Sequence, residues 1–255
     1  MAVTAGFVVA ASLVAERSGP AIGAMIATLP IAAAPSYVFL ALDHDTAFIA
    51  RSALGSLSAN AVTGIFTLVY VVLAQRQPLA VSLAAALAVW FALAFALASV
   101  DWNIVTVVAF NVAVFAVCIP LVVQYCHVAM PRVMRRWYDM LLRAAMVAFL
   151  VAIVVGTSTK IGPSVTGLLA VFPIVLTSLM LIFQPRIGGP ATAALLANTM
   201  WGLAGFSTAL VVLHLAALAF GTWIAYALSL ATSIVWNFVV WSVRRRFALK
   251  PAATR

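Results

Sequence analysis

Long apolar segments follow one another along almost the whole chain, and they are interrupted mainly by prolines, glycines and charged residues. A helix needs about 20 apolar residues to cross the hydrocarbon core of a bilayer. Of the 255 residues, 66% are hydrophobic and only 7% are charged, against roughly 25% charged residues in soluble domains. The pattern therefore predicts an all-α integral membrane protein that forms one domain, residues 1–255, without a separate soluble part.

Nine membrane spans are predicted when charges, prolines and glycines are taken as boundaries. They cover approximately residues 2–16, 20–41, 47–74, 79–99, 103–125, 140–158, 163–183, 191–213 and 218–243. The last boundary is the hardest to place, because HLAALAFGT (214–222) contains only His214 and Gly221 as interruptions. The first segment resembles the apolar core of a signal peptide, but it lacks a basic N-terminal region and is interpreted as a span.

Positive charges fall unequally on the two sides that nine spans create. One side receives only Arg51 and Lys160, and the other receives Arg17, Arg76, Arg132, Arg135, Arg136, Arg143, Arg186, Arg244, Arg245, Arg246, Lys250 and Arg255. Because Lys and Arg concentrate on the cytoplasmic side, we expect a bacterial-type inner membrane protein with its N-terminus outside and its C-terminus in the cytoplasm. The net charge of +9 then fits an anionic lipid surface. No basic segment alternates with exposed aromatics, so nucleic acid is not an expected partner.

Two stretches share one pattern: RSGPAIGAMIATLPI (17–31) and KIGPSVTGLLAVFPI (160–174). The basic residue, the Gly-Pro pair and the Pro-Ile pair match at an offset of 143 residues. A second match, of LSANAVTG (57–64) with LLANTMWG (195–202), has an offset of 138 and aligns Asn60 with Asn198. These matches predict an internal duplication. Since five spans precede the second copy, spans 1–4 and 6–9 form an inverted repeat, with repeat one at about 1–100, a linking span 5 in about 101–139, and repeat two at about 140–246.

The candidate substrate-binding residues come from this repeat. Pro30 and Pro173 lie about eleven residues into their spans, where a proline removes a helical hydrogen bond and produces either a packing kink or a discontinuous helix. Asn60 and Asn198 lie mid-span, where they would either form interhelical hydrogen bonds or belong to a substrate site. Trp201 would line the same site, although packing in the core is the simpler interpretation of this residue.

Two basic residues precede the Gly-Pro starts of spans 2 and 7. Arg17 and Lys160 would add positive charge to a helix N-terminus and attract an anion on each side of the membrane. The alternative is that both side chains extend to lipid headgroups.

The second half resembles the GlpM-like family of small four-span inner-membrane proteins over about residues 157–243. The resemblance rests on GLLAVFPIVLTSLMLIF followed by LLANTMWGLAGFSTALVVL, and in particular on Gly167, Leu168, Phe172, Pro173, Met200, Trp201 and Gly202. The first half keeps Pro30 but has Leu29 and Thr63 in place of the aromatic residue and the tryptophan. The resemblance implies a fused, inverted pair of four-span units, in a family loosely linked to envelope polysaccharide production.

No catalytic arrangement is evident, and no enzyme activity, cofactor or metal site is expected. His127 and His214 are isolated, the DHD cluster at 43–45 is a weak metal motif, and no phosphate-binding loop is present. All five acidic residues fall near span ends, so a carboxylate for ion coupling is missing from the mid-spans. We therefore expect a transporter that moves a small solute, with an anion favoured by Arg17 and Lys160. A flippase or exporter for a lipid or lipid-linked sugar, and a non-transporting scaffold, are the alternatives.

Overall fold

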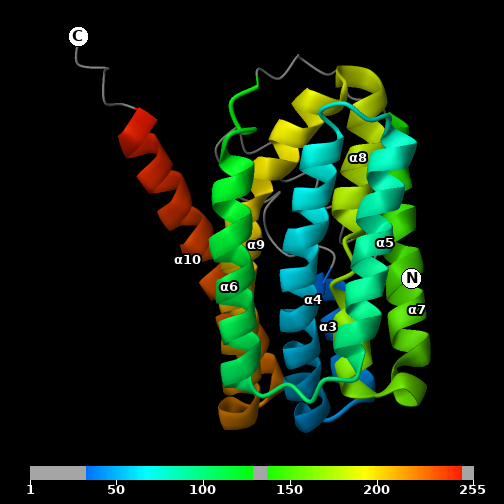
Figure 1. The fold of residues 1–255 in the computed structure, drawn as a ribbon. Helices are drawn as coiled ribbons and strands as arrows, with labels where there is room; N and C mark the ends of the chain where they lie inside the picture. The colour runs from blue at the N-terminus through cyan, green and yellow to red at the C-terminus, as the bar shows by residue number, and fades with distance from the viewer. Residues whose placement is uncertain (1–32, 129–136, 249–255) are drawn as a thin grey trace.

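The computed structural model describes residues 33–128 and 137–248, and every regular element in these ranges is an α-helix (Figure 1). Arg17, Pro30 and the predicted first span lie outside the described residues. The helices are α3 (Ala33–Asp43), α4 (Thr46–Leu73), α5 (Leu79–Ala98), α6 (Ile104–Val123), α7 (Trp137–Ala170), α8 (Ile174–Ile187), α9 (Gly189–Phe220) and α10 (Thr222–Ala248).

Six helical segments in the described ranges are long and apolar enough to cross a membrane. One of them, Leu141–Ile187, contains 47 residues and does not run in a single direction. Gly162 has φ 75° and ψ 171°, and the chain reverses there before Pro163 begins a short helical segment that ends at Ala170. Left-handed backbone of this kind is accessible to glycine at little cost, which explains why the reversal falls at the Gly-Pro pair.

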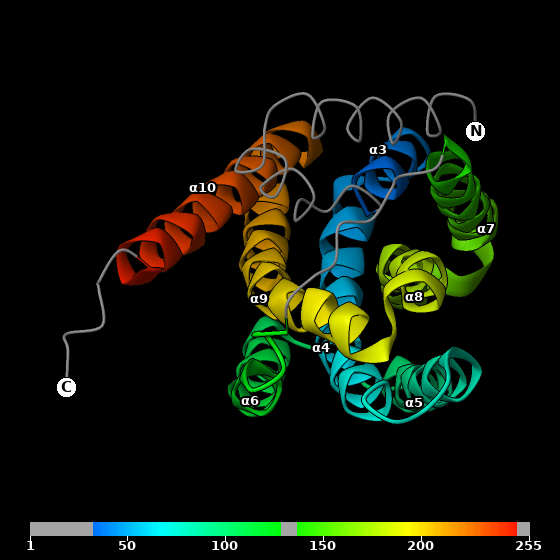
Figure 2. The ribbon, with the colours of Figure 1, turned by 90° about the horizontal axis from the view of Figure 1, so that it is seen from above.

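Helix α4 occupies the centre of the bundle, with the other helices around it in the view along the bundle axis (Figure 2). In the most apolar window of α4, 72% of the residues are buried inside the protein, compared with 11% in α10. The buried positions of α4 include small hydroxyl residues at Ser52, Ser56 and Ser58. Because small residues let helix backbones approach closely, α4 can accept neighbours on all sides.

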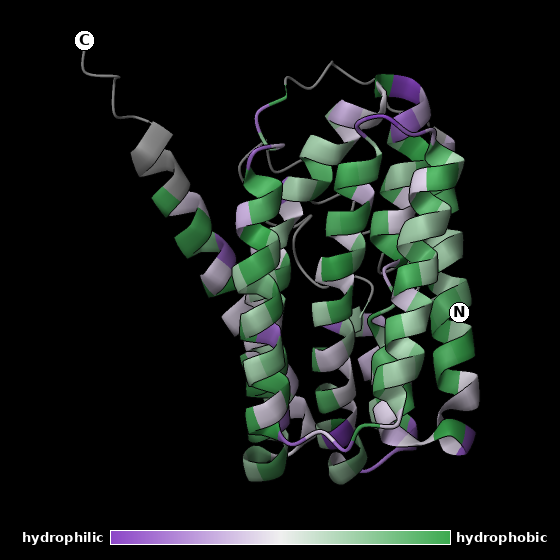
Figure 3. Cartoon of the chain, in the orientation of Figure 1, coloured by the Kyte–Doolittle hydropathy of each residue, from purple (hydrophilic) through white to green (hydrophobic). Residues whose placement is uncertain are grey.

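The outer faces of the surrounding helices are apolar, while hydrophilic residues gather toward the ends of the bundle (Figure 3). Large exposed hydrophobic side chains include Phe95 on α5, Val105 on α6 and Phe149 on α7, with exposed fractions of 86%, 72% and 68%. A soluble protein rarely presents apolar side chains around its whole circumference. This surface is the one expected of a multi-pass membrane protein.

Charged side chains in the described ranges divide between the two ends of the bundle. One end carries Asp43, Asp45, Arg51, Asp101 and Lys160, and the opposite end carries Arg76, Asp139, Arg143 and Arg186. This is the same division of described residues that the span prediction requires. The boundary predicted in 214–222 falls at Gly221, which has φ 84°, so α9 continues seven residues beyond the predicted end at 213.

Helices α4 and α9 pack against each other in opposite directions. The Thr46 hydroxyl at the start of α4 hydrogen-bonds to that of Thr222, just after α9, at 3.2 Å. At the other end, an added Cβ on Gly189 would lie 1.9 Å from the carbonyl oxygen of Ala74, so the start of α9 closely approaches the end of α4. The central pair of the bundle is therefore antiparallel.

Candidate functional site

The helix that follows Gly162 is interrupted between Ala170 and Ile174. Pro173, with φ −74° and ψ 47°, lies outside helical geometry, and no side chain caps the start of α8. The chain crosses the gap through two tight turns, in which the Phe172 amide donates to the Leu169 carbonyl (3.0 Å) and the Ile174 amide donates to the Phe172 carbonyl (2.6 Å). Of the two outcomes considered for the mid-span proline, a packing kink or a discontinuous helix, the structure shows the discontinuous helix at Pro173.

Aromatic side chains cover one side of this interruption. The Phe172 ring packs edge-on against Trp90, with ring centroids 4.9 Å apart, and also contacts Phe91. One turn into α8, the hydroxyl of Thr177 is buried and has no hydrogen-bond partner in the described residues. A helix start leaves backbone N–H groups without intrahelical acceptors, so the gap concentrates polar groups in an apolar part of the bundle.

The short helical segment 163–170 packs closely against α4 because each of the two helices has a glycine at the contact. An added Cβ on Gly167 would lie 1.8 Å from the carbonyl oxygen of Ser52, and one on Gly55 would lie 2.1 Å from that of Ser164. The Ser56 hydroxyl donates to the Gly167 carbonyl at 2.6 Å and also hydrogen-bonds to the Tyr37 hydroxyl at 2.7 Å. At 1.5 Å per residue the segment is about 12 Å long, so it reaches from one end of the bundle to the interruption.

A buried polar network joins α4, α6 and α9 where these helices cross. The Asn60 amide donates to the Leu203 carbonyl and to the Ser207 hydroxyl, each at 2.8 Å. Ser207 in turn donates to Asn111 Oδ1 (2.8 Å), and the Asn111 amide donates to the Leu57 carbonyl (2.9 Å). Asn60 is fully buried, and its side-chain oxygen Oδ1 has no hydrogen-bond partner among the described residues.

The other predicted repeat residues occupy different surroundings. Asn198 is exposed and its amide donates to the Ala194 carbonyl within its own helix at 2.9 Å. Trp201 is 41% exposed, and its carbonyl accepts a hydrogen bond from the Trp236 indole at 2.8 Å. Lys160 is exposed at the end of the bundle. The structure thus joins Asn60 to Leu203 and Ser207 rather than to Asn198, and Trp201 faces outward.

A half-enclosed pocket of about 610 Å³ lies at the end of the bundle that carries Lys160. We call it the Arg51 pocket, and its lining includes Arg51, Asp101, Trp102, Asn103, Pro163, Ser164 and His214. These residues come from the start of α4, the α5–α6 loop, the start of segment 163–170 and the last part of α9. Its volume falls within the range of about 300–1,000 Å³ that is usual for small-molecule sites.

The polar groups of the Arg51 pocket retain unused hydrogen-bonding capacity. Neither Arg51 nor Asp101 forms an ion pair with another described residue. The Trp102 indole N–H is buried without an acceptor in the same ranges. His214 Nδ1 lies 2.8 Å from the Ala50 carbonyl, and since a carbonyl only accepts, Nδ1 carries a proton. In the neutral ring Nε2 is then an acceptor.

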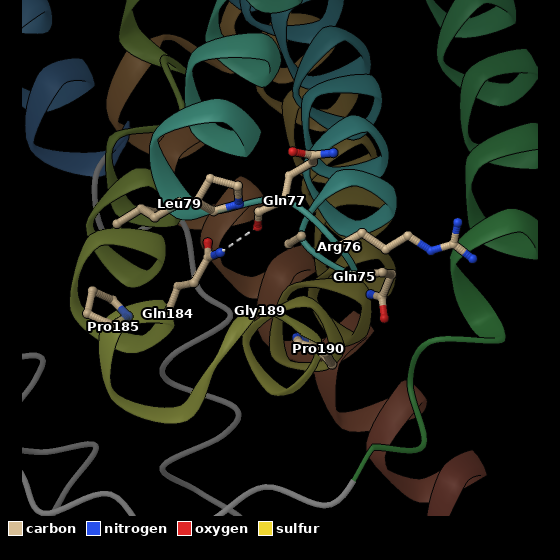
Figure 4. A pocket seen from close by; sticks show the side chains of 10 residues that line it. Gln75, Arg76, Gln77, Leu79, Gln184, Pro185, Gly189 and Pro190 are labelled. Atoms are coloured by element: carbon tan, nitrogen blue, oxygen red, sulfur yellow. Dashed lines mark hydrogen bonds between the residues drawn. The ribbon is translucent and has the colours of Figure 1, made fainter.

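A second pocket, of about 460 Å³, lies at the opposite end between the α4–α5 turn and the α8–α9 junction (Figure 4). Its main polar side chain, Gln184, already has partners: the Tyr70 hydroxyl donates to it at 2.5 Å, and it donates to the Gln77 carbonyl at 3.4 Å. The Arg76 side chain extends away from Gln184 (Figure 4). The Gln184 amide thus links α4 and the α4–α5 turn at this pocket.

An ion pair joins α7 and α8 at this same end. The Arg186 guanidinium donates two hydrogen bonds to the Asp139 carboxylate, at 2.7 and 2.6 Å. Arg186 also lies over the Tyr138 ring, 5.7 Å from its centroid. Paired hydrogen bonds of this geometry are specific and comparatively strong. They fasten the end of α8 to the start of α7.

Sequence reasoning missed the pocket because its residues were interpreted singly. Arg51 was assigned only to a membrane side, Asp101 was counted only among the acidic residues near span ends, His214 was treated as isolated, and Trp102 entered no predicted site. Their common signal is a position within a few residues of span ends on the same predicted side. In the described ranges, no group of three or more His, Cys, Asp or Glu residues could hold a metal ion.

No family model, curated protein or solved structure matches this chain. The similarity to GlpM-like proteins therefore rests on the residues quoted for it, and function must be argued from the arrangement of the site.

Proposed function

We propose that this chain is a multi-pass membrane transporter that moves a small solute by alternating access. The observation that carries the proposal is the interruption at Pro173, within the segment 163–187 that is otherwise long enough to cross a bilayer. Broken helices of this kind place backbone polar groups at the substrate sites of secondary transporters. The unpartnered Thr177 hydroxyl beside the gap supports the same interpretation.

The helix positions support an inverted repeat as the basis of this transport. Helices α4 and α9 start at Thr46 and Gly189, and α5 and α10 start at Leu79 and Thr222, so both pairs are 143 residues apart. This is the offset of the two Gly-Pro stretches, and α4 and α9 run antiparallel as an inverted duplication requires. At this offset Asn60 corresponds to Leu203, whose carbonyl it binds, and not to Asn198, with which the 138-residue offset aligned it. The contact supports a repeat axis near the crossing of α4 and α9. Nine spans remain the proposed total.

The two ends of the bundle differ in a way that fits one state of an alternating cycle. The Arg51 pocket lies at one end, and the opposite end carries the smaller pocket beside Gln184, where the Asp139–Arg186 pair and the Tyr70–Gln184 hydrogen bond join neighbouring helices. Between the two ends, segment 163–170 packs closely on α4 at Gly55 and Gly167, and we propose that this contact separates the two pockets. We propose that the Arg51 end faces outward and that the arginine-rich end faces the cytoplasm of a bacterial-type cell.

Proline substitution in purified protein tests the proposal. Pro173→Leu supplies a backbone N–H and favours a continuous helix, so we expect uptake into proteoliposomes to fall at least about tenfold. The matched control is Pro120→Leu, because Pro120 lies inside α6 without interrupting it. Uptake of radiolabelled glycine, glutamate and inorganic phosphate is measured in parallel. Uptake that is equal in both variants and in the parent protein would contradict a role for the interruption.

A lipid flippase is the second candidate, and the exposed Lys160 at the end that also carries Arg51 favours it, because both cations can bind a headgroup phosphate. Translocation of a fluorescent phosphatidylethanolamine in the same proteoliposomes separates the two activities. The third candidate, a scaffold, is favoured by the packed crossing at Asn60 and predicts neither activity.

A further inference from the structure

We infer that the Arg51 pocket binds a small zwitterion, a molecule with an anionic group and a protonated amine a few bonds apart. The inference rests on the proposed function for its role as the outward-facing substrate site, and it adds the chemical class of the substrate. The binding chemistry itself follows from the lining of the pocket.

Two opposite charges face one cavity without neutralising each other. Arg51 enters from the first turns of α4 and Asp101 from the α5–α6 loop, and neither is paired with another described side chain. A solute with one kind of charge would satisfy only one of them. A zwitterion satisfies both, because its anion can receive hydrogen bonds from the guanidinium and its ammonium can donate to the carboxylate.

Two of the neutral groups that line the pocket, Trp102 and His214, add a hydrogen-bond donor and an acceptor. The Trp102 indole N–H is a donor with no acceptor, and it can add to the anionic subsite. His214 donates from Nδ1 to the Ala50 carbonyl, so in the neutral ring Nε2 is an acceptor that can receive an ammonium hydrogen. Pro163 and Ser164 bring the start of segment 163–170 to the same cavity, where its positive dipole end favours an anion.

The size and location of the pocket restrict the ligand. About 610 Å³ accommodates a free amino acid or phosphoethanolamine, and the pocket lies at a bundle end where a lipid headgroup is also within reach. Both sources present the same pair of charges. A phosphate or carboxylate joined to a primary amine is the shared chemistry, and the source is decided by experiment.

Binding is measured on the full chain in detergent by isothermal titration with single probes. Glycine and phosphoethanolamine carry both charges, whereas acetate, inorganic phosphate and methylamine carry one kind only. We expect at least one zwitterion to bind about tenfold or more tightly than every singly charged probe. Arg51→Gln and Asp101→Asn should each weaken that binding by about tenfold to a hundredfold, as expected for loss of a hydrogen bond to a charged group.

Matched controls are Arg76→Gln, an arginine at the opposite end, and Asp43→Asn, an exposed carboxylate at the same end that does not line the pocket. Both should bind the zwitterion as the parent chain does. Trp102→Phe keeps the ring and removes the N–H, and it should weaken phosphoethanolamine binding without changing the affinity for methylamine. Thermal unfolding of each variant verifies that the fold is retained.

The lipid source is tested with the Leu218→Cys variant, in a background in which Cys118 and Cys126 are alanine, because Leu218 is an exposed lining residue of the pocket that supplies no binding group. Nanodiscs of phosphatidylethanolamine or of phosphatidylglycerol hold this variant, and the rate of modification by a water-soluble thiol reagent reports occupation. If soluble zwitterions do not bind but phosphatidylethanolamine slows modification, the ligand is a headgroup of the inferred chemistry. If neither source binds better than singly charged probes, or if both charge variants bind normally, the inference is wrong.

These outcomes are separable from those of the proposed function. Zwitterion binding that depends on Arg51, together with absence of uptake in proteoliposomes, supports the site and contradicts the transporter. Uptake that Pro173→Leu reduces and that Arg51→Gln and Asp101→Asn leave unchanged supports the transporter and contradicts the zwitterion site.

Discussion

Single residues decide how closely segment 163–170 approaches α4. Gly167 and Gly55 have no side chain, and this lets a backbone carbonyl of the opposite helix lie where a Cβ would otherwise be. The Ser56 hydroxyl adds a hydrogen bond across the contact by donating to the Gly167 carbonyl. Close approach at small residues is a general means of packing helices in membranes, where expulsion of water contributes little to association. The pair was not predictable from the sequence alone, because Gly167 entered the sequence argument only through a family resemblance and Gly55 did not enter it at all.

Substitution of Gly167 by alanine should destabilise the protein. The added Cβ would lie 1.8 Å from the Ser52 carbonyl oxygen, so the two helices must separate; overpacking typically costs about 1–3 kcal/mol. The control is Gly156→Ala, where nothing lies within 4 Å and helix propensity favours alanine by up to about 1 kcal/mol. Thermal unfolding in detergent measures both. Equal melting temperatures for the two variants would mean that the contact is looser than described.

At the scale of elements, charged residues, prolines and glycines in the sequence predicted the boundaries of most described helices. The predicted spans 47–74, 79–99 and 103–125 correspond to α4, α5 and α6 within a few residues. The extent of the gap at 171–173 could not be predicted, because a proline produces anything from a kink to a full break depending on the neighbours that satisfy its freed groups. Here the helix breaks fully, Phe172 packs against Trp90 beside the gap, and no side chain caps the start of α8.

The ion pair between Asp139 and Arg186 is expected to hold the end of α8 in place. Asp139→Asn removes the charge and weakens both hydrogen bonds, so amides of the last turn of α8 and of Gly188 should exchange hydrogen for deuterium faster. Arg76→Gln, at the same end, should leave these amides unchanged. Exchanging the two charges, Asp139→Arg with Arg186→Asp, should restore slow exchange. Unaltered exchange in Asp139→Asn would show that the pair does not restrain α8.

For the whole molecule, the distribution of charge along the sequence predicted which loops share an end, and the structure agrees for the described residues. It did not predict which face of each helix points inward. Apolar residues occur on the inner and outer faces of the surrounding helices, and the polar residues of α4 are buried, so amphipathicity carries little information about rotation. For this reason Asn60 could be placed at mid-span but could not be distinguished from Asn198, which is exposed.

Labelling of whole cells tests whether the two ends of the bundle lie on opposite sides of the membrane. In a background in which Cys118 and Cys126 are alanine, Lys160→Cys and Arg76→Cys place one thiol at each end of the bundle. We expect a membrane-impermeant maleimide to modify residue 160 in intact cells and residue 76 only after permeabilisation. Modification of both thiols in intact cells would contradict the proposed arrangement, and the reverse pattern would invert the proposed orientation.

The interruption at Pro173 also constrains how the protein is made. Segment 163–170 contains eight residues and α8 contains 14, and each is too short to enter a bilayer as an independent span. During biosynthesis the insertion machinery must therefore accept residues 163–187 as one unit. The break between segment 163–170 and α8 can then form when segment 163–170 packs against Ser52 and Ser56 of α4, which is synthesised earlier.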